Sequence, residues 1–600
     1  MNAMRVFSLL CLLTALFAPT FHVFADDPNT YRYVSQFFFT EKNADGIPLQ
    51  YKNVYTLETD YNNEHTDTLS TVCILTSSPS YIEDIDGRLT IPEKAGGYAI
   101  HNIDAEAFAR CILLTEVIIP PSIETIGDGA FCDCPQLATV SLSEGLKEIG
   151  GSAFKGCNAI EVLTIPSTVS SIADNAFANC SQLKRVEGLN FSSSLGRALF
   201  ANCKNLTGID FSKASGKFGN AFAACPALTE VTLPEGVTEI GNEAFEGCGN
   251  LKSISLPSSL EAIGSYAFRY CKALEEITLP DSLKYIYSKV FEDCTKLKSV
   301  KRLNLSACCG ESIFMGCDSL ETLDSCYATG KIGPSVNGAG VFSYWGGLKH
   351  LELPEGVTAI ERGTYANCYN LKSIVFPSSL KSIGQNVFAE CKSLEQVHIP
   401  ATVESIGTDV FSYCTALKNA TVPKLTSNMF VGCKSLTGVT ITSSYKMIPS
   451  GVFGGCSSLS EIDIPYGVVS IGNGAFWEAG IRAITFPETM KVIGSSAFTY
   501  CNVSEIISYI RVPFPIDDSC FSPNTKYQGT LYVPAGTRQL YEATSGWDFH
   551  NIVEMEQQQG IDGIAASEAQ DGCYDLQGRR LRGTPDKELY ISGGRKFLAK

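Results

Sequence analysis

Apolar and polar residues alternate over short stretches of this chain. In one of them, Ile254 and Leu256 alternate with Ser253 and Ser255, and Pro257 follows. A period of two places successive side chains on opposite faces, so the pattern predicts a short β-strand with one face inward. Pro257 has no amide hydrogen and is expected to end the strand.

The same stretch recurs with a fixed length. The common pattern is L-x-x-I-x-L-P-x-x-L/V-x-x-I-G-x-x-A-F-x-x-C, and its first leucine recurs every 23 residues at Leu228, Leu251 and Leu274. A repeat of this length with this leucine pattern is typical of a leucine-rich repeat solenoid. We therefore predict a β-rich solenoid of about 18 coils of 23 residues, in which the core forms only between neighbouring coils.

Two further positions of the repeat have predicted structural roles. An aromatic residue recurs at the same position from Phe108 to Phe498, so we expect one buried ring per coil, as at Phe268. Gly264 stands where we expect a sharp turn that a side chain would obstruct.

Sixteen of the 24 cysteines follow the same repeat. We expect a buried stack of free thiols, because equivalent side chains on stacked coils run parallel rather than toward each other. A disulfide framework, which suits an exported chain, is the alternative. Zinc needs ligands that converge on one point, which one cysteine per coil does not supply. The cysteines three residues after a repeat aromatic are Cys111, Cys134, Cys157, Cys180, Cys203, Cys225, Cys248, Cys271, Cys294, Cys317, Cys368, Cys391, Cys414, Cys433, Cys456 and Cys501, with Trp345 and Ala479 at the same position in two repeats.

Two surfaces are candidates for binding. Solenoids bind partners across the outward face of stacked strands. The second candidate is the irregular stretch 301–347, because insertions in repeats often lie on the binding face, although neutral drift of the repeat also explains it. The outward strand residues are Glu230, Thr232, Ser253, Ser255, Glu276, Thr278, Gln396 and His398, and the aromatic residues of the irregular stretch are Tyr327, Tyr344 and Trp345.

The two ends of the chain differ from the repeats. Arg5, the apolar stretch 6–18 and the small residue Ala25 predict a secretory signal over 1–25, and that stretch is too short to span a bilayer. We expect an N-terminal β cap over 26–88, the solenoid over 89–505 and a C-terminal cap over 506–555, because a solenoid without caps exposes its core. A linker and a small β tail domain are expected over 556–600. No other stretch is apolar enough for a transmembrane segment.

Composition and motifs exclude several classes of function. The net charge of -17 argues against nucleic-acid binding, and 44% hydrophobic residues exclude global disorder. The chain has no H-E-x-x-H, G-x-S-x-G, P-loop or EF-hand motif. Ser378 and Lys381 match S-x-x-K only as part of an ordinary repeat. We therefore expect a protein without catalytic residues, cofactor or metal.

The repeat, and its I-G-x-x-A-F-x-x-C portion above all, resembles the BspA-like leucine-rich repeat family of bacterial surface proteins over roughly residues 89–555. The resemblance implies adhesion and binding of extracellular, host matrix-type proteins such as fibronectin and fibrinogen. Capture of glycans or other polymers is the alternative function. The tail resembles a C-terminal sorting domain of type IX secretion through Tyr574, Gly578 and Arg579, although Glu588 stands where that domain has glycine. This implies secretion or attachment at the outer cell surface.

Overall fold

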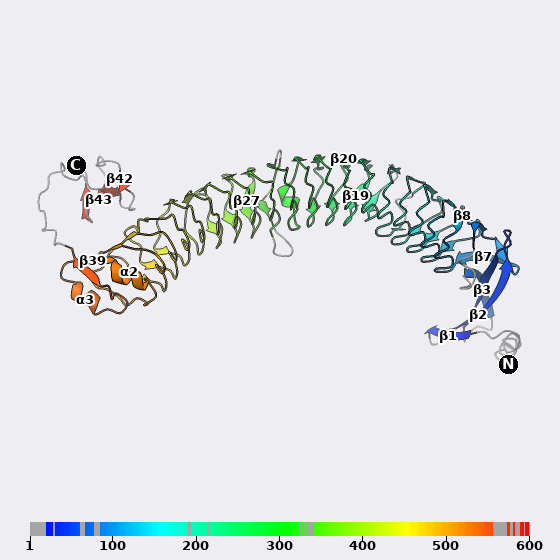
Figure 1. Cartoon of the computed structure of the whole chain (residues 1–600), viewed down its shortest axis with the longest axis horizontal. Helices are drawn as coiled ribbons and strands as arrows, with labels where there is room; N and C mark the ends of the chain where they lie inside the picture. Colours follow the sequence, from blue (N-terminus) through cyan, green and yellow to red (C-terminus); the bar gives the residue numbers. More distant parts are fainter. Residues whose placement is uncertain are drawn as a thin grey trace. The chain divides into compact units, whose positions relative to one another are not determined.

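The computed structural model describes residues 20–27, 30–60, 66–76, 85–189, 194–212, 215–323, 326–328, 330–333, 340–555, 573–575, 580–581, 589–592 and 595–598. The chain forms two units, residues 1–300 and 301–600, and each is considered by itself. Within each unit, short coils of chain stack on one another (Figure 1). The predicted leucine-rich repeat solenoid is confirmed.

The N-terminal end of the first unit is an antiparallel meander of four strands. These are β1 (Thr20–Asp27), β2 (Thr30–Lys42), β3 (Pro48–Asp60) and β4 (Thr66–Thr76). Strand β4 then pairs in parallel with β7 (Tyr98–Ile103), which also pairs with β6 (Lys94–Ala95). The meander is therefore continuous with the sheet that runs through the first coils. Most of the predicted signal, residues 1–19, lies outside the described part of the chain.

The predicted strand of each repeat forms a first row of parallel strands, in register from coil to coil. Glu230 lies beside Ser253, and Thr232 lies beside Ser255. In the first unit the row contains β5 (Gly87–Thr90), β8 (Leu114–Ile118), β10 (Thr139–Ser141), β12 (Val162–Thr164), β14 (Arg185–Glu187), β16 (Gly208–Ile209), β18 (Glu230–Thr232), β20 (Ser253–Ser255) and β22 (Glu276–Thr278), with β24 (Ser299–Lys301) at the unit boundary. In the second unit it contains β26 (His350–Glu352), β28 (Ser373–Val375), β30 (Gln396–His398), β32 (Asn419–Val422), β33 (Gly438–Ile441) and β36 (Ala483–Phe486).

A second row of short parallel strands, which we did not predict, runs through the I-G portion of the repeats. Its isoleucines point inward, as Ile263 and Ile286 do. In the first unit the row begins next to β7 and contains β9 (Thr125–Ile126), β11 (Glu148–Ile149), β13 (Ser171–Ile172), β15 (Ser194–Leu195), β17 (Gly216–Phe218), β19 (Val237–Ile240), β21 (Ala262–Ile263) and β23 (Tyr285–Ile286). In the second unit it contains β25 (Gly330–Ile332), β27 (Val357–Ile360), β29 (Ser382–Ile383), β31 (Ser405–Ile406), β34 (Met447–Ile448), β35 (Ser470–Ile471) and β37 (Val492–Ile493).

The predicted rings form a buried column inside each unit. Phe268 has no exposed surface and stacks on Phe245 at 5.7 Å and on Phe291 at 5.6 Å between ring centroids. In the second unit Tyr365 takes the same place and stacks on Phe388 at 5.6 Å. Offset parallel rings at this spacing are favourable, so the aromatic position links each coil to the next.

The predicted stack of buried thiols is confirmed, and most of these thiols have a hydrogen-bonding role that the sequence did not reveal. Cys271 donates to the carbonyl oxygen of Phe245 in the preceding coil at 3.2 Å. The bond satisfies a backbone acceptor in the core. The same donor geometry, with distances of 2.8–3.4 Å, is made by Cys134, Cys157, Cys180, Cys203, Cys225, Cys248, Cys294, Cys368, Cys391, Cys414, Cys433, Cys456 and Cys501.

The turn around most rings of the column uses left-handed backbone on both sides of the aromatic residue. Tyr266 lies two residues before Phe268 and has a φ of 60°, and Tyr270 lies two residues after Phe268 and has a φ of 61°. At Gly264 a side chain would be obstructed, as predicted, although this glycine is not among the left-handed residues. A Cβ on Gly264 would lie 2.5 Å from the backbone nitrogen of Asn242, so glycine is needed for the close approach of two coils.

The C-terminal end of the second unit continues the first strand row and adds two short helices that we did not predict. Strands β38 (Glu505–Ser508), β39 (Thr530–Val533) and β40 (Asn551–Glu554) extend the row, and α2 (Pro523–Gln528) and α3 (Arg538–Glu542) lie between them. Trp547 is completely buried and its centroid lies 6.4 Å from that of Phe521, the last ring of the column. The bulky indole therefore closes this end of the core.

Beyond residue 555 the structure describes only short strands. They form an antiparallel sheet in the order β42-β41-β43-β44. Their bounds are β41 (Cys573–Asp575), β42 (Arg580–Leu581), β43 (Leu589–Ser592) and β44 (Arg595–Leu598). The tail is thus built from strands, as the sequence predicted.

A 3₁₀ turn, η2 (Leu305–Ala307), lies within the irregular stretch of the repeats.

Candidate functional site

The outward positions of the first strand row carry the predicted binding residues. Within β18, Glu230 and Thr232 are exposed on either side of the buried Val231. The same pattern of exposed, buried and exposed residues recurs in β20, β22 and β30, so all eight predicted residues point to solvent. The register brings Glu230 and Thr232 against Ser253 and Ser255, whereas Gln396 and His398 belong to the second unit.

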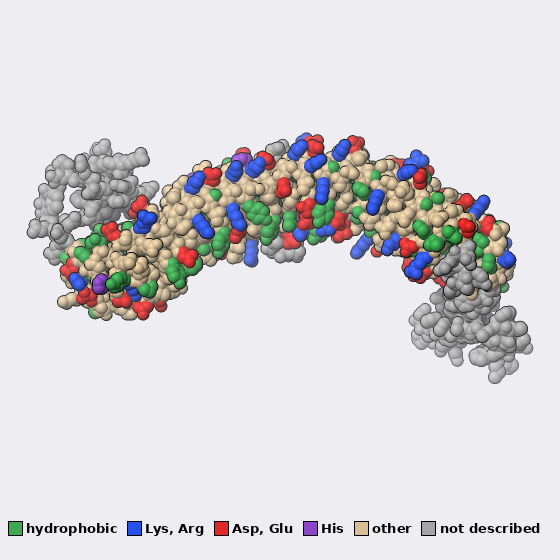
Figure 2. All heavy atoms as spheres, in the orientation of Figure 1, with side chains coloured by type: hydrophobic (Ala, Val, Ile, Leu, Met, Phe, Trp, Pro, Cys, Tyr) green, Lys and Arg blue, Asp and Glu red, His purple; other side chains and the backbone are tan. Residues whose placement is uncertain are grey.

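Beside the second strand row, pairs of opposite charge connect successive coils. Lys147 contacts Glu124 at 2.6 Å, and Lys284 contacts Glu261 at 2.8 Å. The hydrogen bond from Lys147 lowers the pKa of Glu124. Figure 2 shows basic and acidic side chains interspersed on the viewed face of the molecule. Because surface pairs of this kind are worth about 1 kcal/mol or less, they chiefly balance charge.

The irregular stretch does not form the aromatic platform that we expected. Tyr344 is 45% exposed and Tyr327 is partly buried, but Trp345 has no exposed surface. Trp345 occupies the inward cysteine position of its repeat, where its Nε1 donates to the carbonyl oxygen of Leu320 at 2.9 Å and its ring lies 4.9 Å from Phe314. Trp345 therefore cannot stack on a sugar, because its repeat position determines its burial.

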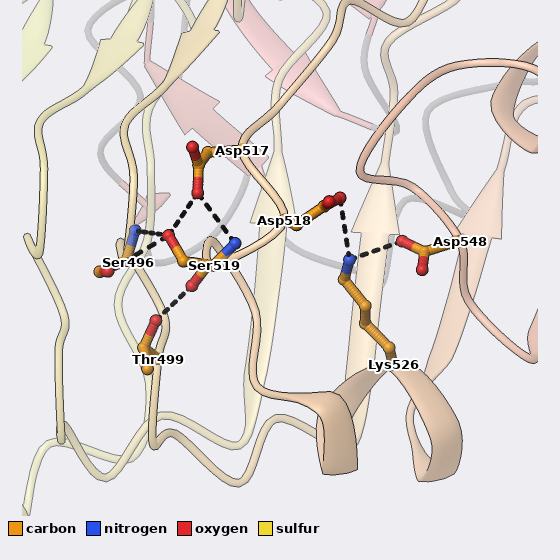
Figure 3. Close-up of polar contacts among 7 residues, drawn as sticks. All are labelled: Ser496, Thr499, Asp517, Asp518, Ser519, Lys526 and Asp548. Atoms are coloured by element: carbon orange, nitrogen blue, oxygen red, sulfur yellow. Dashed lines mark hydrogen bonds and ion pairs between the residues drawn. The ribbon is translucent and has the colours of Figure 1, made fainter.

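A polar cluster lies at the C-terminal end of the second unit (Figure 3). The ammonium group of Lys526 lies 2.5 Å from Asp548 and 3.8 Å from Asp518. The hydrogen bond from Lys526 lowers the pKa of Asp548. The ammonium group thus occupies the position between these carboxylates in which a bound cation would otherwise lie.

The second half of the cluster is a hydroxyl network around Ser519. Its backbone nitrogen donates to Asp517 at 2.9 Å, and its Oγ accepts from the nitrogen of Ser496 at 3.2 Å. The hydroxyl of Thr499 donates to the carbonyl oxygen of Ser519 (Figure 3). The bonds from Ser519 lower the pKa of Asp517. An acid held ionised in this way is poorly suited to proton transfer near neutral pH.

An open hollow of 450 Å³ lies among the turns of the first coils. Glu106, Asp128, Asp133 and Asp174 line it together with Cys132. Burial, followed by the charge of Asp133, raises the pKa of Cys132, so this thiol stays protonated and is not an activated nucleophile. Within the described residues, no group of three or more His, Cys, Asp or Glu is placed to hold a metal ion.

A family model described as the BspA type leucine-rich repeat region (6 copies) matches residues 101–221, 218–337, 337–428 and 423–543. The chain belongs to this family. The BspA-type family is a repeat family, and the match indicates no catalytic one. Among the residues that the structure describes, no helix has the length and apolar character needed to cross a membrane.

Solved structures of other leucine-rich repeat proteins are similar to this BspA-type chain. A protein from Bacteroides ovatus is 20% identical over 84% of this chain and 98% of its own, with a TM-score of 0.39. One from Eubacterium ventriosum is 20% identical over 63% and 94%, with a TM-score of 0.35. A leucine rich cell surface protein from Faecalibacterium prausnitzii is 22% identical over 85% and 98%, with a TM-score of 0.24. No curated protein sequence matches the chain.

One group of half-buried and exposed tyrosines was missed in the sequence. Tyr266, Tyr270 and Tyr287 stand at repeat positions that other coils fill with glycine, asparagine or aspartate. A large ring at a position that suits a small residue was the signal in the sequence. The cysteine and phenylalanine ladders obscured it, because those residues have the same spacing.

Proposed function

We propose that this protein is a non-catalytic binding protein of the outer cell surface that recognises extracellular, host matrix-type proteins through the outward face of its first strand row. The observation that carries the proposal is the repeated exposure of two side chains per strand on a row of parallel strands held in register. Such a face presents a long, rigid surface, which lowers the ordering cost of binding a macromolecule.

We also propose the domain boundaries and the route of export. Residues 1–25 are the signal, 26–88 the N-terminal cap, 89–505 the solenoid, 506–555 the C-terminal cap and 556–600 the linker and sorting tail. The apolar stretch 6–18 and the short strands β41–β44 support the two ends of this scheme.

Charge reversal on the strand face should weaken binding. A Glu230→Lys/Glu276→Lys variant is expected to lose at least about tenfold in affinity for immobilised fibronectin or fibrinogen, because both charges lie within the proposed contact. Biolayer interferometry with the full chain measures this. The matched control is Glu106→Lys/Glu243→Lys, which makes the same charge change on the turns around the ring column. Equal loss in both variants, or in neither, would argue against recognition by the strand face.

Export makes a separate prediction about the ends of the chain. Mass spectrometry of the secreted protein should find an N-terminus at Asp26, because signal peptidase reads the small residue before it. Deletion of 556–600 should move the protein from the cell surface or medium to the periplasm in a host with type IX secretion. Surface display without this tail would refute its proposed sorting role.

A further inference from the structure

Exposed tyrosines gather on one part of the first unit, on the turns around Phe268 and on the neighbouring strand β23. Tyr270 is 40% exposed, Tyr285 is 50% exposed and Tyr287 is 40% exposed. Tyr285 lies in β23 and Tyr287 directly follows that strand, and their ring centroids are 6.2 Å apart. The backbone nitrogen of Tyr266 donates to the carbonyl oxygen of Ser288 at 3.0 Å, which places the two turns side by side. We call Tyr266, Arg269, Tyr270, Tyr285 and Tyr287 the tyrosine cluster.

The rings around Arg269 are held in place by the guanidinium group. Its Cζ lies 4.5 Å from the ring centroid of Tyr266 and 5.2 Å from that of Tyr270. Its Nε donates to Glu246 at 2.9 Å, and Glu292 lies 3.7 Å from Nη1 on the other side. An arginine fixed by two carboxylates from adjacent coils therefore orients both rings before any ligand arrives.

Folding alone does not account for tyrosine at these positions. Tyr266 and Tyr270 both have left-handed backbone, which bulky residues adopt at a steric cost. The equivalent positions of other coils carry glycine, as at Gly247, and also other residues with the same conformation, as at Glu243 and Lys289. The left-handed backbone therefore belongs to the repeat, which does not require a tyrosine ring at either position.

The charges of the tyrosine cluster favour an uncharged ligand. Lys272 lies 6.0 Å from the Tyr270 ring and Lys289 lies 5.9 Å from the Tyr266 ring. Arg269 pairs with Glu246 and Glu292, and Lys289 also pairs with Glu292. The cluster is thus nearly neutral within a chain of net charge -17, which would repel an acidic ligand. Sugar rings present C–H groups that pack on the negative face of an aromatic ring, and their hydroxyls suit charged donors and acceptors nearby.

We propose that the tyrosine cluster binds a neutral polysaccharide, with sugar units packing on Tyr270, Tyr285 and Tyr287. This activity is separate from protein recognition by the first strand row. It places glycan capture at the turns and at β23 instead of at the irregular stretch 301–347.

Affinity electrophoresis of the full chain through gels that contain β-glucan, α-glucan, mannan or galactan tests the proposal. At least one of these neutral polymers should retard the protein. Tyr270→Ala/Tyr287→Ala should weaken that retardation at least about tenfold, because each stacked ring contributes substantially to binding. Tyr270→Phe/Tyr287→Phe should stay within about threefold of the parent, because the ring faces are retained.

The controls separate this proposal from the others. Tyr466→Ala/Tyr509→Ala removes two exposed rings of the second unit and should leave retardation unchanged. The Glu230→Lys/Glu276→Lys variant should still bind the polysaccharide even if it loses its protein ligand. Retardation by heparin or polyglutamate but by no neutral polymer would overturn the proposal in favour of an acidic ligand. Absence of any retardation, or full retention by Tyr270→Ala/Tyr287→Ala, would also overturn it.

Discussion

The Phe268→Ala variant is expected to lose about 3–5 kcal/mol of unfolding free energy, because it removes a fully buried ring from a packed core. The ring stacks on Phe245 and Phe291, so the cavity would open between three consecutive coils. Urea denaturation followed by circular dichroism measures the change. Since each coil contacts only its neighbours, hydrogen exchange should show the loss of protection concentrated in these coils.

Two variants serve as controls for the buried ring. Phe268→Leu keeps most of the side-chain volume and should lose less than the alanine variant. Tyr285→Ala removes an exposed ring of the same unit and should cost about 1 kcal/mol or less. A loss below ~1 kcal/mol for Phe268→Ala would show that the ring is not packed as described.

Alkaline pH is expected to destabilise the folded protein progressively, once thiols begin to ionise in the unfolded chain. Burial raises the pKa of Cys203 and of Cys248 from 9.0 to about 12. Between these values the folded chain keeps protons that the unfolded chain releases, so the folded state loses stability as pH rises. The loss is about 1.4 kcal/mol per pH unit for each such thiol, and stability is unaffected well below pH 9.

A variant with fewer thiols tests this cause. Cys203→Ser/Cys248→Ser keeps a donor to the carbonyl oxygens of Phe177 and Phe222, but serine does not titrate in this range. The pH dependence of its unfolding free energy between pH 9 and 12 should be shallower than that of the parent by about 2.7 kcal/mol per pH unit. Both proteins are compared in reductant. Parallel curves would assign the alkaline transition to groups other than the buried thiols.

The tyrosine cluster shows the limit of reading function from a repeat. The pattern of the sequence placed Glu230 and His398 outward correctly, since alternation along a strand determines which side chains are exposed. It placed Trp345 in a candidate binding stretch, yet the repeat position turned that side chain into the core. Arg269 and Tyr266 drew no attention, because their contact depends on turn geometry and on carboxylates contributed by neighbouring coils.

The sequence by itself determined the repeat, the inward positions and the ladders of rings and thiols, because burial between identical coils imposes the same spacing on each. It did not reveal why cysteine recurs, since the partner of Cys271 is a backbone oxygen 26 residues earlier. The second strand row, the left-handed turns and the close approach at Gly264 likewise arise only when coils stack. Tertiary structure alone decided these features, because each depends on the distance between segments that are one repeat apart.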